Sequence, residues 1–372
     1  MSYDLLEQED TFTFELLDIE GYDEVIKITD SKTSLMAIIA LHDLSLGQGL
    51  GGIRIMPYKT FDDALFDVLR LSKGMTYKSA IAEVGFGGGK SVIIADPKSP
   101  NKKELLLAFG RAVHKLKGKY ICAEDMGCSL NDVKIIRKET PYVVGLPHKN
   151  SSGDPGRFTA WGTFRGIEAV LQKVYGSKDV KNRKIALQGL GNVGMYLIDY
   201  LFWRGAEIIV ADIDQEKLDF VKNKYHVKIV SPDKIIEEKC DVFCPCAMGA
   251  ILNDETIEKL NTKAIAGAAN NQLLDDSHAQ MLKDINILYA PDFVINGGGL
   301  LNVAMELEKE GYNPRRAQEK TDNIYHSLLS IFELAEKKDV TTNEAAVSLA
   351  MHKVKNGIGK RKNEVFFHHT AE

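Results

Sequence analysis

KIALQGLGNVGMYLIDYLFWRGAEIIVAD, residues 184–212, is the stretch that decides the fold of this 372-residue chain. Residues 184–188 form a short apolar run typical of a buried strand. Residues 191–204 are expected to form a helix, and residues 207–211 a second strand. A strand, a glycine-rich turn, a helix and a second strand in this order predict a parallel βαβ unit.

The turn in this unit has the spacing Gly-x-Gly-x-x-Gly, which predicts a dinucleotide-binding site in this context. Gly189 permits a tight turn, Gly191 lets backbone N–H groups approach a pyrophosphate, and Gly194 allows close packing of helix on strand. Asp212 can accept hydrogen bonds from a ribose 2′-hydroxyl and would repel a 2′-phosphate, which favours NAD over NADP. A turn without a ligand, and an Asp212 that only caps its strand, are the alternatives. The expected cofactor residues are Gly189, Gly191, Asn192, Val193, Gly194 and Asp212.

The alternation of strands and helices continues on both sides of this unit. Towards the C-terminus we expect strands at 227–230, 241–245, 264–268 and 287–290, then amphipathic helices at 315–337 and 343–354. Towards the N-terminus we expect strands at 12–16, 25–28, 36–41, 91–95 and 120–122, and helices at 60–73, 102–116, 129–138 and 159–175. This order favours an α/β protein with an N-terminal α/β domain and a Rossmann-type dinucleotide-binding domain.

A polar stretch rich in Ser, Gly and Pro, from Pro147 to Gly156, predicts the boundary between the domains. We expect a substrate-binding domain over residues 1–147, with the C-terminal helices of 344–372 packing back onto it. The NAD-binding domain is expected over residues 149–343. A cleft between the two domains is expected to close over the substrate.

Composition excludes several classes of function. The chain is 44% hydrophobic and 27% charged with a net charge of −5, so no basic excess points to nucleic acid. Its apolar runs have the length of strands, and its start lacks the pattern of a signal peptide, so we expect a cytoplasmic protein. Five cysteines, an odd number, indicate reduced thiols. Cys240, Cys244 and Cys246 are read as a strand end rather than as metal ligands, and no metal site is expected.

A second glycine-rich region lies between Leu50 and Asp125 and contains two lysines and an aspartate among apolar elements. Within it, Gly85–Lys90 followed by Ser91 is close to a phosphate-binding Walker A loop. Val84 stands where that loop needs its first glycine, and Lys90 leads into an expected strand instead of a helix. We therefore expect these glycines to let the backbone fold tightly, so that Lys90 points into a cleft.

Six motifs together make the chain resemble the glutamate, leucine, phenylalanine and valine dehydrogenase family over nearly its whole length, with most similarity to the leucine enzymes. They are Leu50-Gly51-Gly52-Ile53-Arg54, Gly74-Met75-Thr76-Tyr77-Lys78, Gly87-Gly88-Gly89-Lys90, Ala123-Glu124-Asp125-Met126-Gly127, Gly189–Gly194 and Asn296-Gly297-Gly298-Gly299. The resemblance implies reversible, NAD-dependent oxidative deamination of an L-amino acid to a 2-oxo acid and ammonia.

The resemblance also implies roles for individual residues. Lys78 stands where the family binds the substrate carboxylate, and Lys90 stands at the lysine that activates water. Asp125 stands at the carboxylate that moves protons to and from the amine. A lysine acts as a base only when burial or a nearby cation lowers its pKa, and we expect Lys78 and Lys90 to lie close together. Asn271 is expected near nicotinamide and substrate, Gly51 beside the substrate, and Thr159 at the cofactor.

The side-chain pocket is expected to be apolar. The glutamate enzymes of the family have a lysine where this chain has Leu50, and a distal carboxylate buried there without a partner would be costly. The expected pocket residues are Leu50, Met75, Ala123, Leu300 and Val303. Ala123 resembles the leucine enzymes and Leu300 the phenylalanine enzymes, so a branched-chain substrate is favoured and an aromatic one is the alternative.

A non-catalytic NAD-binding sensor on the same fold is the alternative of another class. It would have no need for Lys78, Lys90 and Asp125 together. The resemblance also implies a homo-oligomer, an octamer or a dimer, and no membrane partner. Two departures from the family pattern stand out: Gly156-Arg157 replaces a usual Ser-Pro, and Gly297 replaces a usual alanine.

Overall fold

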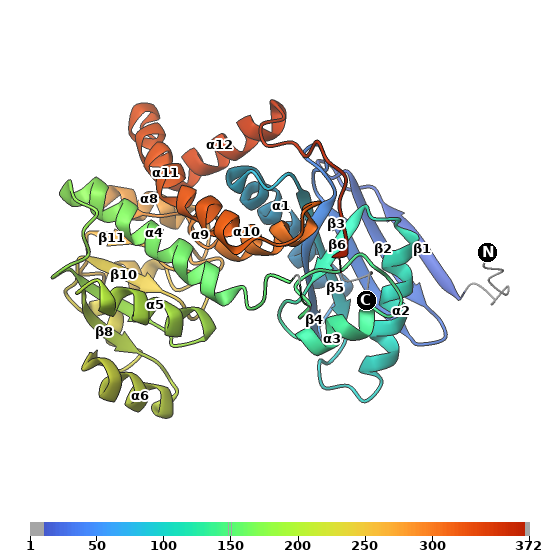
Figure 1. Cartoon of the computed structure of the whole chain (residues 1–372), viewed down its shortest axis with the longest axis horizontal. Coiled ribbons are helices and arrows are strands. Elements are labelled where there is room, and N and C mark those ends of the chain that lie inside the picture. The colour runs from blue at the N-terminus through green and yellow to red at the C-terminus, as the bar shows by residue number, and fades with distance from the viewer. Residues whose placement is uncertain (1–10, 148, 150, 369–372) are drawn as a thin grey trace. The chain divides into compact units, whose positions relative to one another are not determined.

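The computed structural model describes residues 11–147, 149 and 151–368, which fold into two compact α/β units. The first unit comprises residues 1–153, 309–311 and 357–372, and the second comprises 154–308 and 312–356. Each unit contains a six-stranded sheet flanked by helices, as the ribbon in Figure 1 shows. The expected fold class, two α/β domains of which one has a Rossmann-type parallel sheet, is confirmed.

The first unit has a mixed sheet in the order β1-β2-β3-β5-β4-β6. Its elements are β1 (Phe12–Leu17), β2 (Glu24–Asp30), β3 (Leu35–Leu41), β4 (Gly49–Met56), α1 (Phe61–Ala82), β5 (Gly87–Ile94), α2 (Lys102–Lys115), β6 (Tyr120–Ala123) and α3 (Leu130–Ile136). Neighbours among β1, β2, β3 and β5 are antiparallel, whereas β4 is parallel to both β5 and β6. The glycine-rich strand β4 was absent from the expected set, because its run of glycines lacks the apolar alternation that predicts a strand.

Both faces of this sheet are buried, because successive side chains of a strand point to opposite faces. Ile38 on β3 packs with Val68 of α1 in one core cluster. Its neighbour Ile39 packs with Leu106 and Phe109 of α2 in another. The central strands therefore have one face under α1 and the other under α2 and α3.

The glycines before Lys90 do not form the tight loop that was expected. Gly87, Gly88 and Gly89 are the first residues of β5, and a positive φ occurs earlier, at Gly85. A Cβ on Gly88 would lie 2.0 Å from Thr76 Oγ1 of α1, and one on Gly89 would lie 2.8 Å from the Tyr120 ring. These positions exclude side chains because helix α1 and the ring of Tyr120, from β6 on the far side of β4, approach the backbone closely, and not because the chain turns.

Helix α1 begins as expected and ends later than expected. Thr60 and Asp63 form the capping box that the sequence indicated. The helix continues to Ala82 instead of ending near residue 73, and beyond Gly74 its Thr76 lies against Gly88 of β5. The extension places Met75 and Lys78 on this helix.

The second unit has a wholly parallel sheet in the order β12-β11-β10-β7-β8-β9, the doubly wound arrangement. Its strands are β7 (Lys184–Gln188), β8 (Glu207–Ala211), β9 (Lys228–Ile229), β10 (Val242–Pro245), β11 (Ala264–Ile265) and β12 (Leu288–Tyr289). Its helices are α4 (Gly156–Tyr175), α5 (Asn192–Trp203), α6 (Gln215–Tyr225), α7 (Asp254–Ile257), α8 (Ser277–Asp284), α9 (Asp292–Ile295), α10 (Gly298–Ala304), α11 (Pro314–Lys338) and α12 (Thr342–Lys355), with 3-10 turns η1 (Ile235–Glu237) and η2 (Met305–Leu307).

The C-terminal region differs from the expected domain division. Helix α12 belongs to the second unit, where it packs against α11, so residues 344–356 do not return to the first unit. The chain returns only from Gly357 onwards. There, Arg361 donates its backbone N–H to the Leu46 carbonyl at 2.9 Å and places its guanidinium 4.6 Å from the Phe86 ring centre.

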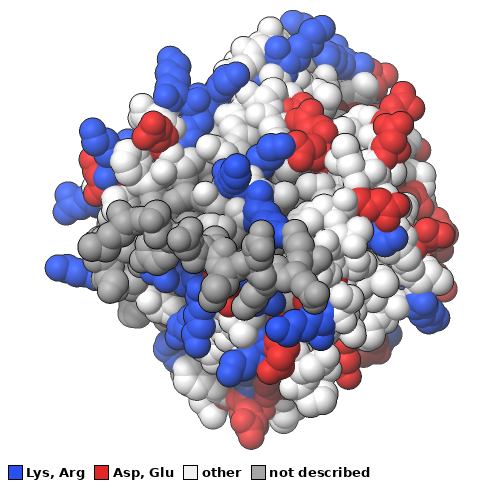
Figure 2. All heavy atoms as spheres, turned by 90° about the vertical axis from the view of Figure 1, so that its right-hand side faces the viewer, with Lys and Arg blue, Asp and Glu red and all other residues white. Residues whose placement is uncertain are grey.

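Acidic and basic side chains share the face of the molecule drawn in Figure 2. Lys and Arg side chains are spread over several parts of that face, and Asp and Glu side chains occupy others. In the described part of the chain, no helix has both the length and the apolar character needed to cross a bilayer.

Candidate active site

Lys90 and Asp125 form a partly buried ion pair on the first unit. Lys90 lies on β5, and Asp125 lies two residues beyond the end of β6. Strand β4 separates these two strands in the sheet, yet Lys90 Nζ is 3.0 Å from Asp125 Oδ2. The pair spans β4 above Gly52, where a Cβ would lie 2.7 Å from Asp125 Cβ and 3.1 Å from Lys90 Nζ. The missing side chain of Gly52 therefore leaves the space in which the two groups meet.

The surroundings change the protonation of both groups. The side chain of Lys90 is 7% exposed and that of Asp125 is 24% exposed. Burial lowers the pKa of the Lys90 ammonium, and the Asp125 carboxylate opposes that shift only in part. Burial alone would raise the pKa of the Asp125 carboxyl, but Lys90 and Arg54 outweigh it and the net shift is downwards. The site thus contains an ionised acid beside a lysine that loses its proton more readily than usual.

The loop that carries Asp125 is fixed to its neighbours by backbone hydrogen bonds. Asp125 and Cys128 exchange two of them, at 3.3 and 2.9 Å, and the Ile55 N–H donates to the Met126 carbonyl at 2.9 Å. Gly127 has a φ of +77°, and a Cβ there would lie 2.1 Å from the Ile55 carbonyl oxygen. The turn is therefore held directly against β4, which sets the position of Asp125.

Arg54 is a third charged group at the site, and no role for it was expected from the sequence. Its Nε donates to Asp125 Oδ2 at 3.1 Å, and its Nη1 donates to Asp67 Oδ2 at 2.8 Å. The signal that could have found it is alternation along β4, because Gly52 and Arg54 are two residues apart and share a face of the strand. Its partner Asp67 lies on α1 and could not have been inferred from spacing.

The other expected substrate residues of this unit surround the same strands. Leu50 on β4 is 1% exposed, and Gly51 approaches β5 so closely that a Cβ would lie 1.8 Å from the Gly89 carbonyl oxygen. That Cβ would also lie 3.5 Å from Met75 Cγ of α1. Ala123 ends β6 and is partly buried, and the half-buried Lys78 lies one turn beyond Met75 on α1. The closeness of Lys78 to Lys90 stays a prediction.

In the second unit, the glycines of the fingerprint turn have the packing that the sequence indicated. Gly189 has a φ of +99°, and a Cβ there would lie 2.8 Å from the Ala247 side chain. A Cβ on Gly194 would lie 2.0 Å from the Gly189 carbonyl oxygen. The turn follows the carboxyl end of β7 and leads into α5, whose N-cap, Gly191, has no side chain to satisfy the first N–H groups. Such a helix start fits a pyrophosphate.

Asp212 has a structural role that is compatible with the expected one. It directly follows β8, and its carboxylate accepts a short hydrogen bond from the Leu190 N–H and one of 2.8 Å from the Asp214 N–H. Asp212 therefore does cap the end of its strand, as the alternative interpretation implied. Because each carboxylate oxygen can accept more than one hydrogen bond, these contacts leave capacity for ribose hydroxyls and hold the carboxylate beside the fingerprint turn.

The remaining expected residues of the second unit lie on three different segments. Asn271 is exposed with a φ of +51°, and its carbonyl accepts a 2.6 Å hydrogen bond from the Ala250 N–H. Thr159 is on the first turn of α4, where its hydroxyl donates to the Pro155 carbonyl at 3.0 Å. The other members of the expected set are Leu300 and Val303, both partly buried on α10, and Asn192 and Val193, the first two residues of α5.

The two departures from the family pattern have different structural weight. A Cβ on Gly156 would lie 2.4 Å from Asn192 Nδ2, so a side chain there would displace the fingerprint asparagine. Asn192 is held by Asp154, to which its amide donates at 2.7 Å. Gly297 has an ordinary φ of −65°, and a Cβ there would meet only the Val294 carbonyl, at 3.1 Å. We therefore attach more importance to Gly156 than to Gly297.

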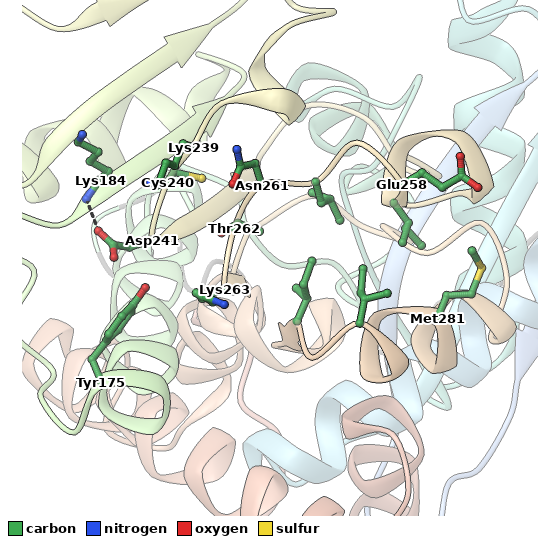
Figure 3. A pocket seen from close by; sticks show the side chains of 14 residues that line it. Tyr175, Lys184, Lys239, Cys240, Asp241, Glu258, Asn261, Thr262, Lys263 and Met281 are labelled. Atoms are coloured by element: carbon green, nitrogen blue, oxygen red, sulfur yellow. Dashed lines mark hydrogen bonds between the residues drawn. The ribbon is translucent and has the colours of Figure 1, made fainter.

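A pocket of about 650 Å³ in the second unit lies at the wrong end of its sheet for the cofactor. Figure 3 shows its lining, with Lys184, Asp241 and Tyr175 on one side and Met281 and Glu258 on the other. Lys184 begins β7 and Asp241 precedes β10, so the pocket is at the amino ends of the strands. Ligands of open α/β sheets bind at the carboxyl ends, where the fingerprint turn lies.

Two family models match this chain. Residues 21–142 match the family model described as Glu/Leu/Phe/Val dehydrogenase, dimerisation domain, and residues 209–361 match the one described as Glutamate/Leucine/Phenylalanine/Valine dehydrogenase. The chain is 42% identical to a leucine dehydrogenase of Thermoactinomyces intermedius over 342 residues, covering 92% of this chain and 93% of that one.

Two further relatives carry other substrate names. The chain is 46% identical to a phenylalanine dehydrogenase of Caldalkalibacillus thermarum, with 90% of this chain and 91% of that one covered. A crystal structure of L-tryptophan dehydrogenase from Nostoc punctiforme superposes with a TM-score of 0.81 at 43% identity, covering 91% of this chain and 97% of that one. The chain belongs to the glutamate/leucine/phenylalanine/valine dehydrogenase family, the nicotinamide-dependent oxidoreductases that act on the CH–NH₂ group of amino acids.

Proposed function

We propose that this protein catalyses the reversible, NAD-coupled oxidative deamination of an apolar L-amino acid, with branched-chain amino acids preferred, to the 2-oxo acid and ammonia. The observation that carries the proposal is the Lys90–Asp125 ion pair, 3.0 Å long and shielded from solvent on the lysine side. Burying a charged lysine has a desolvation cost. A protein that only binds NAD would gain nothing from that burial, which speaks against the sensor alternative.

The chemistry assigns a task to each member of the pair. The hydride leaves the α-carbon only after the amine has lost its proton, and an ionised Asp125 can accept that proton. Water must then attack the resulting iminium carbon. Burial lowers the pKa of Lys90, so a larger fraction of this lysine is neutral at mildly alkaline pH and can act as the base towards that water. We assign Lys78 to the substrate carboxylate by its place on α1, as the resemblance implies.

The cofactor residues are proposed from the second unit. NAD supplies the hydride acceptor for this reaction. The N-terminus of α5, which no side chain caps, suits its pyrophosphate, and Asp212, held beside the turn by its bond to the Leu190 N–H, suits a ribose diol. Thr159 and Asn271 complete the proposed cofactor set.

The choice among apolar substrates rests on the pocket residues, because the relatives do not separate the candidates. Leucine, phenylalanine and tryptophan dehydrogenases are 42%, 46% and 44% identical to this chain. Leu50 is buried and offers no partner to a distal carboxylate, which supports an apolar side chain over glutamate. Ala123 supports a branched-chain side chain, whereas Leu300 supports the aromatic alternative.

The test is a substrate profile on the purified protein, read as reduced-nicotinamide absorbance at alkaline pH. The panel contains L-leucine, L-valine, L-isoleucine, L-phenylalanine, L-tryptophan and L-glutamate, each with NAD and with NADP. We expect the highest kcat/KM with a branched-chain amino acid and NAD. Highest activity with phenylalanine or tryptophan would support the alternative, and NAD binding without turnover of any substrate would support the sensor.

We also propose that the protein is a cytoplasmic homo-oligomer. The family model that matches residues 21–142 is described as a dimerisation domain. Among the described strands, β1 has a neighbour on one side only, and its apolar residues Phe14 and Leu16 are 36% and 69% exposed. Light scattering coupled to size-exclusion chromatography measures the number of chains. A monomer at micromolar concentration would contradict the proposal.

A further inference from the structure

We propose that Arg54 is a positioning residue for the reaction: held by Asp67 and Tyr58, its guanidinium fixes one oxygen of Asp125 and leaves the other to take the proton of the substrate amine. The inference rests on the proposed function, because it assigns a role to Arg54 only through that of Asp125. It adds three residues to those that support catalysis: Arg54 on β4, Tyr58 just after β4, and Asp67 on α1.

The contacts of Asp125 are unequal between its two oxygens. Lys90 Nζ lies 3.0 Å from Oδ2, and Arg54 Nε donates to the same Oδ2 at 3.1 Å. No described residue donates a hydrogen bond to Oδ1. Both cations therefore bind Oδ2, and Oδ1 remains available to the substrate.

Arg54 is itself held by a second carboxylate, that of Asp67. Its Nη1 donates to Asp67 Oδ2 at 2.8 Å, and the Tyr58 hydroxyl donates to the same oxygen at 2.6 Å. The other oxygen of Asp67 lies 3.5 Å from Arg70 Nη2. The side chains of Arg54 and Asp67 are 15% and 13% exposed, so solvent weakens this pair little. Asp67, bound on both oxygens, gives the guanidinium a fixed anchor on α1.

The geometry requires a guanidinium. Its Nε and Nη1 lie on a rigid planar fork, and each donates to a different carboxylate. A lysine has one point charge on a flexible stem and cannot hold two carboxylates in that relation. Asp67 and Asp125 come from α1 and from the loop after β6, so Arg54 also joins two elements that carry the site.

Catalysis gives a reason for this restraint. The terminal torsion of an aspartate is broad, so a carboxylate with one contact can rotate and present either oxygen. Two donors on Oδ2 restrict that rotation and keep Oδ1 in one direction. The positive charge of Arg54 also contributes to the lowered pKa of Lys90 and of Asp125.

Five variants of the full-length protein test the proposal: Arg54→Gln, Arg54→Lys, Asp67→Asn, the double variant Arg54→Gln/Asp67→Asn and the control Arg111→Gln. Arg111 pairs with Glu139 at 3.6 Å on the other face of the same unit, so it matches the substitution without touching the site. We expect Arg54→Gln to lower kcat roughly 10²-fold and Arg54→Lys roughly 10-fold, with the KM for the amino acid changed only a few-fold. Arg111→Gln is expected to match the wild type.

The pH profile separates positioning from general loss of structure. Because Arg54 lowers the pKa of Lys90, Arg54→Gln is expected to move the rising limb of kcat towards higher pH. Arg54→Lys keeps the charge and is expected to lower kcat without that movement. Asp67→Asn is expected to lower kcat less than Arg54→Gln, and the double variant to be no slower than Arg54→Gln alone, because Asp67 acts through Arg54.

Thermal melting of every variant identifies those that fold. If Arg54→Gln does not fold, the comparison of Arg54→Lys and Asp67→Asn with Arg111→Gln decides the question by the same kcat criterion. Wild-type kcat and pH profile in the folded Arg54 variants would overturn this inference and leave the proposed function intact. Absence of amino acid oxidation by the wild type would overturn both.

Discussion

Replacing Gly52 by alanine tests the arrangement of the active site with a single methyl group. Gly52 lies on β4 beneath the Lys90–Asp125 pair. The added Cβ would lie 2.7 Å from Asp125 Cβ, 2.7 Å from the Glu124 carbonyl oxygen and 3.1 Å from Lys90 Nζ. Gly52→Ala changes no charge and removes no hydrogen bond, so its effect reports on geometry alone.

The magnitude follows from these distances. Ordinary contact begins at 3.4 Å, so the loop around Asp125 must withdraw by about 0.7 Å, the difference between 3.4 and 2.7. Backbone atoms take part in the clash, and a side-chain rotation cannot relieve it. Overpacking of this kind costs about 1–3 kcal/mol of stability. A misplacement of about 1 Å in a catalytic group costs up to about 10²-fold in rate, so we expect kcat to fall between 10-fold and 10²-fold.

The assay compares Gly52→Ala with Gly74→Ala, a matched control in the same unit. Gly74 lies within α1, and a methyl group added to it would have nothing within 4 Å, so alanine there is expected to stabilise the helix by about 0.5–1 kcal/mol. Steady-state kinetics with NAD and the preferred amino acid give kcat. Protein fluorescence titration gives the affinity for NAD, which is expected to stay unchanged because Gly52 is in the other unit.

Two results would refute this reasoning. Wild-type kcat in a folded Gly52→Ala variant would mean that the position of Asp125 above Gly52 is not needed for turnover. An equal loss of kcat in Gly74→Ala would mean that the rate responds to any change in this unit and not to the ion pair.

Three further outcomes are expected. Lys90→Ala abolishes turnover and leaves NAD affinity nearly unchanged, which isothermal titration measures; a parallel loss of NAD affinity would count against the assignment of Lys90 to chemistry. Because burial lowers the pKa of Lys90, kcat/KM for oxidative deamination rises with pH through an apparent pKa below the ordinary 10.5, and a midpoint at or above 10.5 in the pH–rate profile would contradict it. Leu50→Lys places a cation at a buried position that now holds an apolar side chain, so the ratio of kcat/KM for L-glutamate over L-leucine rises at least 10-fold, and an unchanged ratio would remove Leu50 from the pocket.

Features that depend on neighbours along the chain were predictable from the sequence. They include the capping box of Thr60 and Asp63, the strand at residues 184–188 and the fingerprint turn after it, because caps and tight turns involve residues a few positions apart. The expected end of α1 near residue 73 was wrong, since the helix continues to Ala82 and its later turns pack against β5, a contact that spacing along the chain does not show.

The sequence by itself determined the two α/β units, the glycine-rich turn after β7 and the residue types of the candidate active site. Only the tertiary structure decided that Lys90 and Arg54 bind the same oxygen of Asp125. It also decided that Asp67 on α1 holds Arg54 in place. It also decided why Gly88 and Gly52 are glycines: close approach of a helix and of two charged side chains. The physical reason is that strand order brings together residues 35 to 71 positions apart, and spacing along a chain carries no information about which strands become neighbours.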